Sequence, residues 1–347
     1  MLSITTYRPF NTESYYVINK DSKKEKYRSR ANEKKTAIHW GQRKLFLTVL
    51  QFMTLYVDLG TVETPTRPKI VYAGAAPGHN IALLAKLFPT CEFHLYDTNP
   101  FSQLLNEFTT GDNPRVTIYK QYFLDDDARR WTDQQDVYFI SDIRRDIAGK
   151  STIVAERVIQ EDMQMQQRWY ELMRPKQAQF KFHLPYSGMG FETTTDYLDG
   201  TVYVQPWRGP SSTECRLVPV WGRKKVWNNI DYEDANFHIN AVLRERVSFT
   251  NPITGDESHI DGMELTNDYD SSMEICIFLD YLKRFSPNYT EHYTKAVTLS
   301  KILTKTITFN LDVVGGNLQM EHLRSDPFLL TPKNSVFVND EEGDITG

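Results

Sequence analysis

Residues 69–80 read Lys-Ile-Val-Tyr-Ala-Gly-Ala-Ala-Pro-Gly-His-Asn, and this stretch decides the fold. The run at 70–73 is apolar and rich in strand-forming residues, which predicts a short buried strand. Gly74 and Gly78 allow a sharp turn after the strand and a close approach of the backbone to a ligand. Residues 79–87 follow as a predicted helix, whose free amino-terminal amides face that ligand. The stretch therefore predicts a nucleotide-type ligand site.

The spacing within the turn separates two classes of nucleotide ligand. Dinucleotide sites use Gly-x-Gly-x-x-Gly, whereas Gly74 and Gly78 enclose Ala-Ala-Pro, with Pro77 where a pyrophosphate needs a free amide. The next predicted strand, 92–96, ends in Asp97, where a carboxylate accepts both hydroxyls of a ribose. This order of elements suits S-adenosylmethionine. The alternative is an ordinary tight turn with Asp97 as a loop carboxylate.

Further elements continue the strand–helix alternation of a parallel sheet. Strands are expected at 115–120, 136–141 and 177–183, with helices at 42–56 and 152–173. Two short strands at 202–205 and 213–220 are expected to form an antiparallel edge. Helices are expected at 232–245, 272–285 and 294–307. The pattern predicts an α/β fold, a Rossmann-like and mostly parallel central sheet with helices on both faces.

Composition limits the class of protein. The 347 residues are 40% hydrophobic and 24% charged, as in soluble globular proteins, and no apolar run reaches the roughly 20 residues of a membrane span. The amino-terminal residues lack a signal-peptide core, and three scattered cysteines predict a reducing compartment and no metal site. We expect a cytoplasmic protein with no membrane partner. A net charge of −5 means that any RNA-binding surface is local.

The expected organisation is a basic arm at 1–35, one catalytic-type domain at 36–315 and a partly disordered tail at 316–347. Residues 20–35 carry eight Lys or Arg around Tyr27. Such a run is either a solvated arm or a segment that holds an RNA backbone and stacks a base. The basic and aromatic segment at 221–227 is either a surface turn, the commoner case, or a small cluster suited to RNA.

Four charged residues fit one reaction when taken together. Lys181 stands in an apolar strand, where an ammonium is costly to bury unless it is paired or used. Asp142 ends the neighbouring strand, while Lys44 and Glu214 lie in other predicted elements. A lysine whose pKa is lowered by burial or a nearby cation can take the proton of a ribose hydroxyl. Taken singly, each of these four residues is more often structural than catalytic.

Five motifs carry a resemblance to a known family. They are Gly-Gln-Arg-Lys-Leu-Phe-Leu around Lys44, Val-Tyr-Ala-Gly-Ala-Ala-Pro-Gly at 71–78, Ile-Ser-Asp-Ile-Arg at 140–144, Phe-Lys-Phe at 180–182, and Ser-Thr-Glu-Cys-Arg-Leu at 212–217. In order and spacing, from about residue 35 to 310, the chain resembles the poxvirus-type cap-specific mRNA (nucleoside-2'-O-)-methyltransferase. That protein is also the small, processivity subunit of poly(A) polymerase.

The resemblance implies the function and its residues. It implies methyl transfer from S-adenosylmethionine to capped mRNA, a viral poly(A) polymerase catalytic subunit as partner, and a location in the host cytoplasm or virion. The implied catalytic residues are Lys44, Asp142, Lys181 as the base, and Glu214. The implied cofactor-binding residues are Tyr72, Gly74, Ala76, Pro77, Gly78, Asp97, Asn99, Phe123, Leu124 and Asp142. The implied cap-binding residues are Tyr186, Glu233, Tyr27 and His183, with two aromatic rings and acidic groups gripping the methylated base.

Two other functions remain open at this point. The four charged residues also suit a 2'-O-methyltransferase for another RNA, such as ribosomal RNA. A polymerase accessory factor without catalysis is the third candidate, which the presence of all four costly charges disfavours. The chain also departs from the family pattern, with Gly188 and Ser211 where the family has an acidic residue and a tyrosine.

Overall fold

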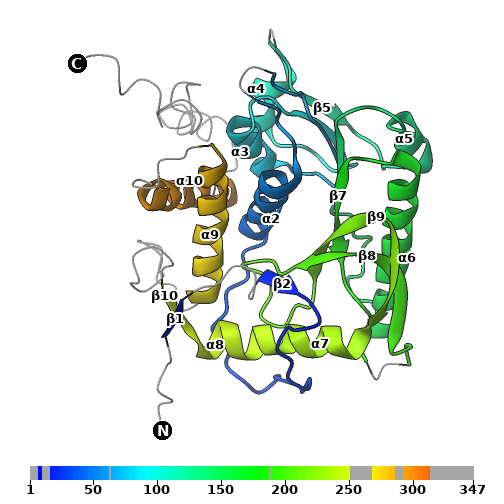
Figure 1. Cartoon of the computed structure of the whole chain (residues 1–347), viewed down its shortest axis with the longest axis vertical. Helices are drawn as coiled ribbons and strands as arrows, with labels where there is room; N and C mark the ends of the chain where they lie inside the picture. Colours follow the sequence, from blue (N-terminus) through cyan, green and yellow to red (C-terminus); the bar gives the residue numbers. More distant parts are fainter. Residues whose placement is uncertain are drawn as a thin grey trace.

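The computed structural model describes residues 7–9, 16–61, 64–111, 113–187, 190–250, 268–285 and 292–312. Within these residues a central sheet of eight strands is enclosed by helices (Figure 1). A separate parallel pair joins β1 (Tyr7–Pro9) to β10 (Ser248–Thr250). The tail expected at 316–347 and Gly188 lie outside the described residues. No helix in the described ranges is long and apolar enough to cross a membrane.

The large sheet has the order β2-β8-β9-β7-β6-β3-β4-β5. Its strands are β2 (Val17–Ile18), β3 (Lys69–Ala73), β4 (Glu92–Tyr96), β5 (Val116–Tyr119), β6 (Val137–Ser141), β7 (Gln177–Phe182), β8 (Thr194–Tyr203) and β9 (Cys215–Asn228). Strands β5, β4, β3, β6 and β7 are parallel, and β9, β8 and β2 continue the sheet antiparallel. The expected Rossmann-like sheet with an antiparallel edge is confirmed.

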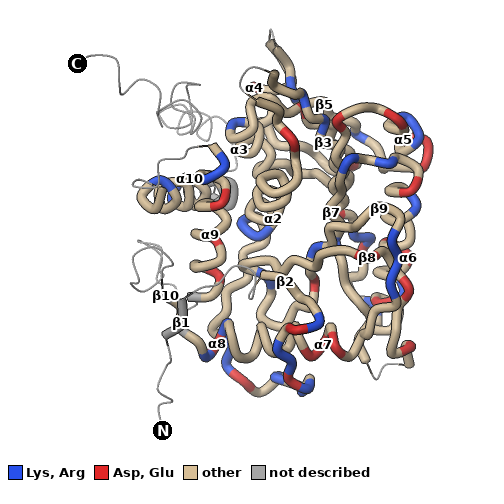
Figure 2. Tube along the Cα trace, viewed as in Figure 1, with Lys and Arg blue, Asp and Glu red and all other residues tan. Residues whose placement is uncertain are grey.

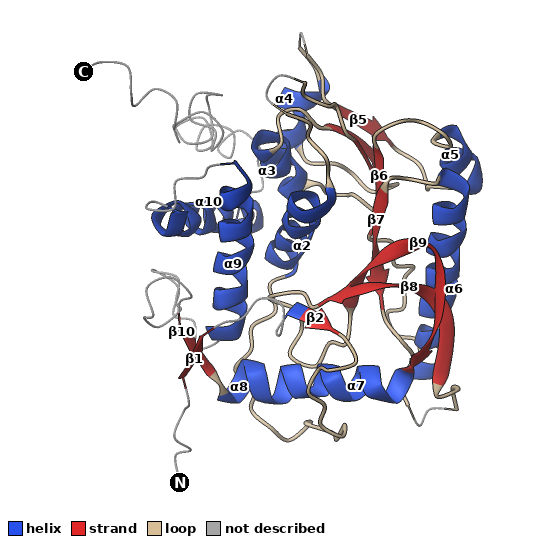
Figure 3. Cartoon of the chain, viewed as in Figure 1, coloured by secondary structure: helices blue, strands red, loops and turns tan. Residues whose placement is uncertain are grey.

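Helices cover both faces of this sheet. They are α2 (Gly41–Tyr56), α3 (His79–Leu87), α4 (Asn106–Thr109), α5 (Asp125–Arg130), α6 (Thr152–Met173), α7 (Asn229–His238), α8 (Arg244–Arg246), α9 (Asp268–Phe285) and α10 (His292–Asp312), with a 3-10 turn η1 (Gln103–Leu105) and a π-helical turn η2 (Ile239–Leu243). Figure 3 shows α2 and α3 on one face and α5 and α6 on the other. The pair α9 and α10 packs outside α2 and α3.

The strand order places a crevice at one edge of the sheet. The chain leaves β3 toward β4 and β5 on one side, and it returns to β6 and β7 on the other. Parallel strands end at the same edge, so the loops after β3 and β6 diverge at a switch point, where open α/β sheets bind their ligands. Both strands are almost fully buried, as strands covered on both faces are.

The two edge strands correct the sequence prediction. Short strands were expected at 202–205 and 213–220, but β8 begins at Thr194 and β9 continues to Asn228. Every residue from 220 to 226 is exposed, so this part of β9 lacks the alternation by which a half-buried strand is recognised. A register shift lies between Leu198 and Gly200, where a Cβ on Gly200 would meet the Val218 carbonyl oxygen at 2.2 Å. Segment 221–227 is therefore strand, not a surface turn.

The basic arm packs along α7 where the structure describes it. Lys24 forms an ion pair with Asp231 at 2.9 Å, and the Tyr27 backbone amide donates to Asp234 at 2.9 Å. Figure 2 shows basic positions of the arm beside acidic positions of α7. Further along, the Arg30 guanidinium lies 3.3 Å from the carboxylate of Glu245. The arm is thus held by acidic side chains and presents Tyr27 at a defined place.

Candidate active site

The glycine turn after β3 lies directly against the end of β6. Gly74 has φ +80°, and a Cβ there would lie 3.0 Å from the backbone of both Asp142 and Ile143. Only glycine combines this left-handed conformation with so close an approach. Gly78 has φ +73° and precedes the first residue of α3. The two glycines thus bring the turn, the helix amino terminus and Asp142 together at the switch point.

Asp97 reaches across this turn from the end of β4. One carboxylate oxygen accepts the Ala76 backbone amide at 3.1 Å, and the other accepts the backbone and side-chain amides of Asn99 at 2.9 and 3.0 Å. These bonds fix the orientation of the carboxylate, and an ionised carboxylate has about four acceptor positions, which leaves capacity for ribose hydroxyls. The turn and Asp97 therefore fit the adenosyl part of S-adenosylmethionine.

The other expected cofactor residues occupy different environments. The Tyr72 side chain is buried, and burial, followed by the charge of Asp142, raises the pKa of its hydroxyl. Phe123 is only 5% exposed because it packs among Phe139, Tyr96 and Trp169. Leu124 is 59% exposed. Of these two expected cofactor-binding residues, Leu124 is the one whose side chain is exposed enough to contact a ligand.

The four charged residues meet beside the glycine turn as two ion pairs. Lys181 Nζ lies 3.0 Å from Asp142 Oδ1 and donates to the Asp142 backbone carbonyl at 3.0 Å. Lys44 Nζ lies 3.1 Å from Glu214 Oε1. The four side chains are between 11% and 21% exposed, so the pairs are partly shielded from water yet reachable. The structure brings together all four residues that the sequence singled out.

Arg216 is a fifth charged residue of this group, which the sequence reasoning did not select. Its guanidinium lies 2.5 Å from Asp142 Oδ1 and donates to Gln205 at 2.9 Å. In the register of β7 and β9, Lys181 is directly opposite Arg216, and side chains of opposed residues share one face. Two cations therefore flank one carboxylate.

Burial and neighbouring charges set the protonation of the group. Burial lowers the pKa of the Lys181 ammonium below its ordinary value, although Asp142 and Glu214 act in the opposite direction. Arg216 lowers the Lys181 pKa further. Burial alone would raise the pKa of Asp142 and of Glu214, but the surrounding cations outweigh it and hold both carboxyl pKa values below their ordinary range. The site therefore favours charged carboxylates around a lysine whose pKa is lowered.

A buried ion pair one residue before Lys44 fixes α2 in position. The Arg43 guanidinium donates to Glu274 of α9, and both side chains are fully buried. The Trp207 indole donates to the same carboxylate at 2.7 Å. Because Arg43 is held on the α9 side, Lys44 at the start of α2 is directed toward Glu214. The motif around Lys44 thus has one structural and one site-facing cation.

Two arginines connect the charged group to α6. Arg144, in the loop after β6, lies 3.6 Å from Glu214 and 3.6 Å from Asp162 of α6. Arg145 donates to Asp162 at 2.6 Å, so the loop is fastened to the helix. The sequence analysis assigned neither arginine a role, although Arg144 ends the motif at 140–144. Their role as bridges follows from the packing of α6 beside β7.

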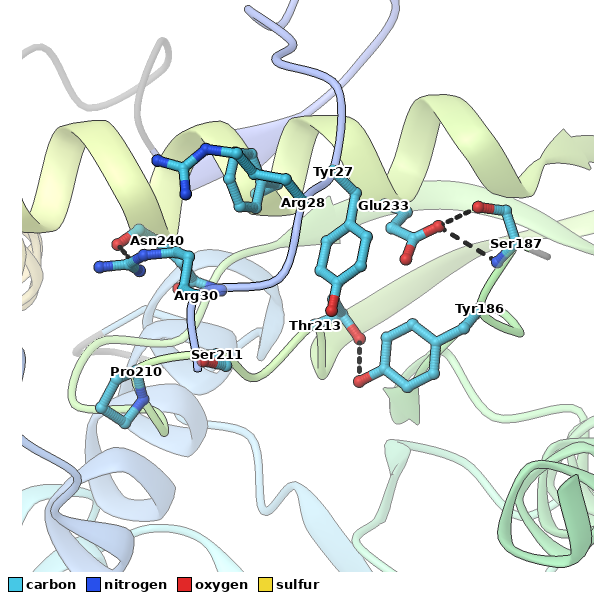
Figure 4. A pocket seen from close by; sticks show the side chains of 11 residues that line it. Tyr27, Arg28, Arg30, Tyr186, Ser187, Pro210, Ser211, Thr213, Glu233 and Asn240 are labelled. Carbon is cyan, nitrogen blue, oxygen red and sulfur yellow. Dashed lines mark hydrogen bonds between the residues drawn. The ribbon is translucent and has the colours of Figure 1, made fainter. Parts of the chain in front are cut away.

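An aromatic cavity of about 260 Å³ opens between the arm and α7. Figure 4 shows the rings of Tyr27, from the arm, and Tyr186, from the loop after β7, projecting into it. Tyr27 is 52% exposed and makes an edge contact with Phe237 at 5.7 Å. The buried Glu233 of α7 lines the same cavity and accepts the backbone amide of Ser187 at 3.1 Å, as well as its hydroxyl. The two rings and the carboxylate predicted for the cap lie together.

His183 lies behind this cavity instead of lining it. Its ring is 5% exposed and touches the Tyr186 ring edge-on, with centroids 5.0 Å apart. It lines a second cavity of about 380 Å³, whose walls include Tyr186, Thr213, Glu214 and Arg144. The two cavities adjoin at Tyr186 and Thr213, and the second one extends to Glu214 and Arg144 of the charged group.

Ser211 lines the aromatic cavity, at the place where the family pattern has a tyrosine. In the part of the chain that the structure describes, no three His, Cys, Asp or Glu side chains are grouped so that they could hold a metal ion.

Comparison with family models gives a match over most of the chain. A family model described as "Poly A polymerase regulatory subunit" matches residues 10–310. No curated protein matches the chain. The matched range includes every site residue described above.

Proposed function

The chain belongs to the family of poly A polymerase regulatory subunits, and from that premise we propose that it is also a cap-dependent mRNA 2'-O-methyltransferase. It transfers a methyl group from S-adenosylmethionine to the ribose 2'-hydroxyl of the nucleotide next to the 7-methylguanosine cap. One observation carries this proposal. A buried lysine with a lowered pKa, Lys181, is held at the crevice beside a glycine turn.

Lys181 is the general base. A ribose hydroxyl is a weak nucleophile at neutral pH, so its proton must leave as the oxygen attacks. The neutral amine of Lys181 takes that proton and becomes an ammonium. S-adenosylmethionine supplies a methyl group on a cationic sulfur. Asp142 carries negative charge at the end of β6, next to the glycine turn, where it favours binding of a cation.

The surrounding charges lower the barrier further. Arg216 beside Asp142 and Arg144 beside Glu214 add positive charge to the site, which favours an oxygen that becomes partly anionic during transfer. Charges fixed before the reaction need no reorganisation, so such groups stabilise the transition state efficiently. Glu214 holds Lys44 and, by its charge, acts on Lys181. The two ion pairs keep the base oriented toward the crevice.

The aromatic cavity supports selection of a methylated cap. A 7-methylguanine carries a positive charge, which the faces of Tyr27 and Tyr186 attract and the Glu233 carboxylate neutralises. The second cavity adjoins the aromatic cavity at Tyr186 and Thr213 and is lined by Glu214, which supports placing the next nucleotide there. An unmethylated guanine lacks the charge and gains less from the same rings.

Membership of the family also supports a polymerase partner. A regulatory subunit acts on a catalytic subunit, so we propose that the chain binds the catalytic subunit of a poly(A) polymerase. Methyl transfer and polymerase binding can reside on one chain, because the crevice described above uses only one edge of the sheet.

The decisive experiment compares two short RNAs that differ only at the 5' end, one with a 7-methylguanosine cap and one with a triphosphate. Labelled methyl is supplied as S-adenosylmethionine, and the product is mapped by nuclease digestion. We expect transfer to the capped RNA at the ribose of the first nucleotide. Transfer to both RNAs would instead favour a methyltransferase for other RNA. Transfer to neither, with the donor bound, would leave a polymerase accessory factor.

Tyr186→Ala sharpens this comparison. Loss of one stacking ring is expected to reduce the preference for capped RNA about 5- to 150-fold, the range given by 1–3 kcal/mol of aromatic stacking on a base. Trp221→Ala is the matched control, because Trp221 is an exposed aromatic on the far part of β9. An unchanged preference in Tyr186→Ala would remove the cap from the proposal.

A further inference from the structure

A row of buried polar side chains lies behind the aromatic cavity and takes no part in the proton transfer described above. It consists of Glu156 in the first turns of α6, His183 after β7, and Thr213 before β9. Their exposed fractions are 2%, 5% and 7%. Burying three polar groups is costly unless they bond to one another, so their arrangement calls for a role.

The contacts form one continuous chain that ends at the stacking ring. His183 Nε2 lies 2.9 Å from both carboxylate oxygens of Glu156. His183 Nδ1 lies 2.8 Å from Thr213 Oγ1, which in turn lies 3.4 Å from the hydroxyl of Tyr186. The imidazole also contacts the Tyr186 ring edge-on at an interplanar angle of 73°. Tyr186 is thus held both at its hydroxyl and along its edge.

The hydrogen-bonding capacities give this chain a direction. A carboxylate only accepts, so His183 Nε2 donates to Glu156. The Thr213 hydroxyl donates to the hydroxyl oxygen of Tyr186, which leaves the lone pairs of Thr213 Oγ1 to face His183 Nδ1. Glu156 therefore orients the His183 ring, and that ring orients the Thr213 hydroxyl that bonds to Tyr186.

We propose that His183, oriented by Glu156, is a positioning residue that fixes the Tyr186 ring through Thr213 and thereby determines selectivity for the methylated cap. This inference rests on the proposed cap function and adds to it Glu156 and His183, neither of which lines the aromatic cavity, while Thr213 lines it and joins them to Tyr186. Stacking on both sides of a flat base needs two rings held parallel at a fixed separation. Groups that lock the rotamer of a binding residue are what preserve such a geometry.

The main test uses Thr213→Val, which keeps the shape of the side chain and removes its hydrogen bonds. Affinities for 7-methyl-GTP and GTP are measured by calorimetry. We expect 7-methyl-GTP to bind about threefold to tenfold more weakly, the range for one lost hydrogen bond, with GTP and S-adenosylmethionine affinities unchanged. Thr213→Ser keeps the hydroxyl and is expected to restore the wild-type preference.

A ligand-free measurement tests the contact itself. Burial raises the pKa of Tyr186, and the hydrogen bond from Thr213 acts against that rise. Tyrosine labelled with carbon-13 at Cζ reports this titration by NMR, and the Tyr186 signal is the one absent from Tyr186→Phe. In Thr213→Val the Tyr186 pKa should move upward, and in Thr213→Ser it should return.

The contact between Glu156 and His183, at the far end of the hydrogen-bonded series from Tyr186, needs its own variant. His183→Leu alone leaves Glu156 buried and unpaired, which endangers folding. The double variant His183→Leu/Glu156→Leu removes both polar groups and should show the same loss of 7-methyl-GTP affinity as Thr213→Val. Adding Tyr186→Phe to Thr213→Val should produce no further loss, because both act on one contact.

Two failures are distinguishable. If the wild type prefers 7-methyl-GTP and Thr213→Val keeps that preference, the positioning role is wrong and the cap function stands. If the wild type binds 7-methyl-GTP and GTP equally, the cap function is wrong, and the selectivity role falls with it. An unchanged Tyr186 titration in Thr213→Val would also overturn the inference, whatever the ligand affinities.

Discussion

Replacing Lys181 by Met removes the proposed base and leaves its neighbours paired. Asp142 keeps the Arg216 guanidinium at 2.5 Å, and Glu214 keeps Lys44 at 3.1 Å. No carboxylate is left buried without a partner, which is the usual source of large losses at such sites. Met also preserves most of the aliphatic stem against the strand. We therefore expect the free energy of unfolding to stay within about 2 kcal/mol of the wild type.

The loss of activity should be much larger than the loss of stability. General acid–base catalysis contributes about 100- to 10,000-fold to a rate, so Lys181→Met should slow methyl transfer by that factor. Lys181→Arg separates the base from its charge. Arginine stays protonated in proteins, so this variant keeps the cation beside Asp142 and cannot accept a proton. It should be as inactive as Lys181→Met.

Single-turnover transfer to capped RNA, with enzyme in excess, isolates the chemical step. S-adenosylmethionine affinity and thermal unfolding are measured on the same samples. Lys176→Met is the control, because Lys176 immediately precedes β7 and pairs with Asp136 at 2.5 Å, at the opposite end of the strand from Lys181. If Lys181→Met or Lys181→Arg retained more than about a tenth of the wild-type rate, general-base catalysis by Lys181 would be refuted.

Two further predictions concern charge and position. The neutral amine is the active form, so the rate rises as pH passes the lowered pKa of Lys181. Glu214→Gln removes an anion that raises the Lys181 pKa, so the rising limb of the pH–rate profile should move to lower pH. Arg216→Gln removes a cation that lowers the Lys181 pKa, so the limb should move to higher pH. If both variants moved the limb in the same direction, the assignment of Lys181 as the base would be contradicted. Asp234→Ala removes the acceptor of the Tyr27 amide and should cost about 1 kcal/mol of local stability, seen as faster hydrogen exchange in the arm while exchange in the central sheet stays unchanged.

The sequence was sufficient where local pattern and tertiary structure agree. The strand at 69–73 and its glycine turn were recognisable because apolar residues and two glycines stand in one short segment. Asp97 and Asp142 were placed in one crevice because both end parallel strands, a rule of topology that needs no coordinates. The long helix α6 was predicted with the bounds 152–173 that the structure has.

The pairing of strands and the packing between distant segments determine the features that could not be predicted from the sequence. Arg216 joins the charged group because it is opposite Lys181 across β7 and β9, and an antiparallel register is not visible in one strand alone. The exposed half of β9 shows no alternation of buried and exposed residues, so it was not recognised as a strand. Phe123 looks like any aromatic after a strand, and only the packing of Phe139 and Trp169 places it in the core.

The amino-terminal end of the helix expected at 232–245 was also predicted incorrectly. It begins earlier, at Asn229, because the side chain of Asn228 accepts the backbone amide of Asp231. Asparagine is a preferred cap, but β9 runs directly into the helix here, and no loop residues mark the junction. Glu233 is consequently placed in the second turn, with its carboxylate in the aromatic cavity.

The position of the methylated nucleotide follows, on the proposed mechanism, from the chain between two residues. Lys181 and Tyr186 are five residues apart on β7 and the loop after it, so their Cα atoms can be separated by at most about 18 Å. The base lies in β7 and the stacking ring in the loop four residues after it, so the short chain between them limits how far the cap can lie from the base. Glu156 and Thr213 hold the middle of that segment at His183. A fixed distance from ring to base admits only a ribose close to the cap, so selection of the first nucleotide needs no contact that reads its sequence.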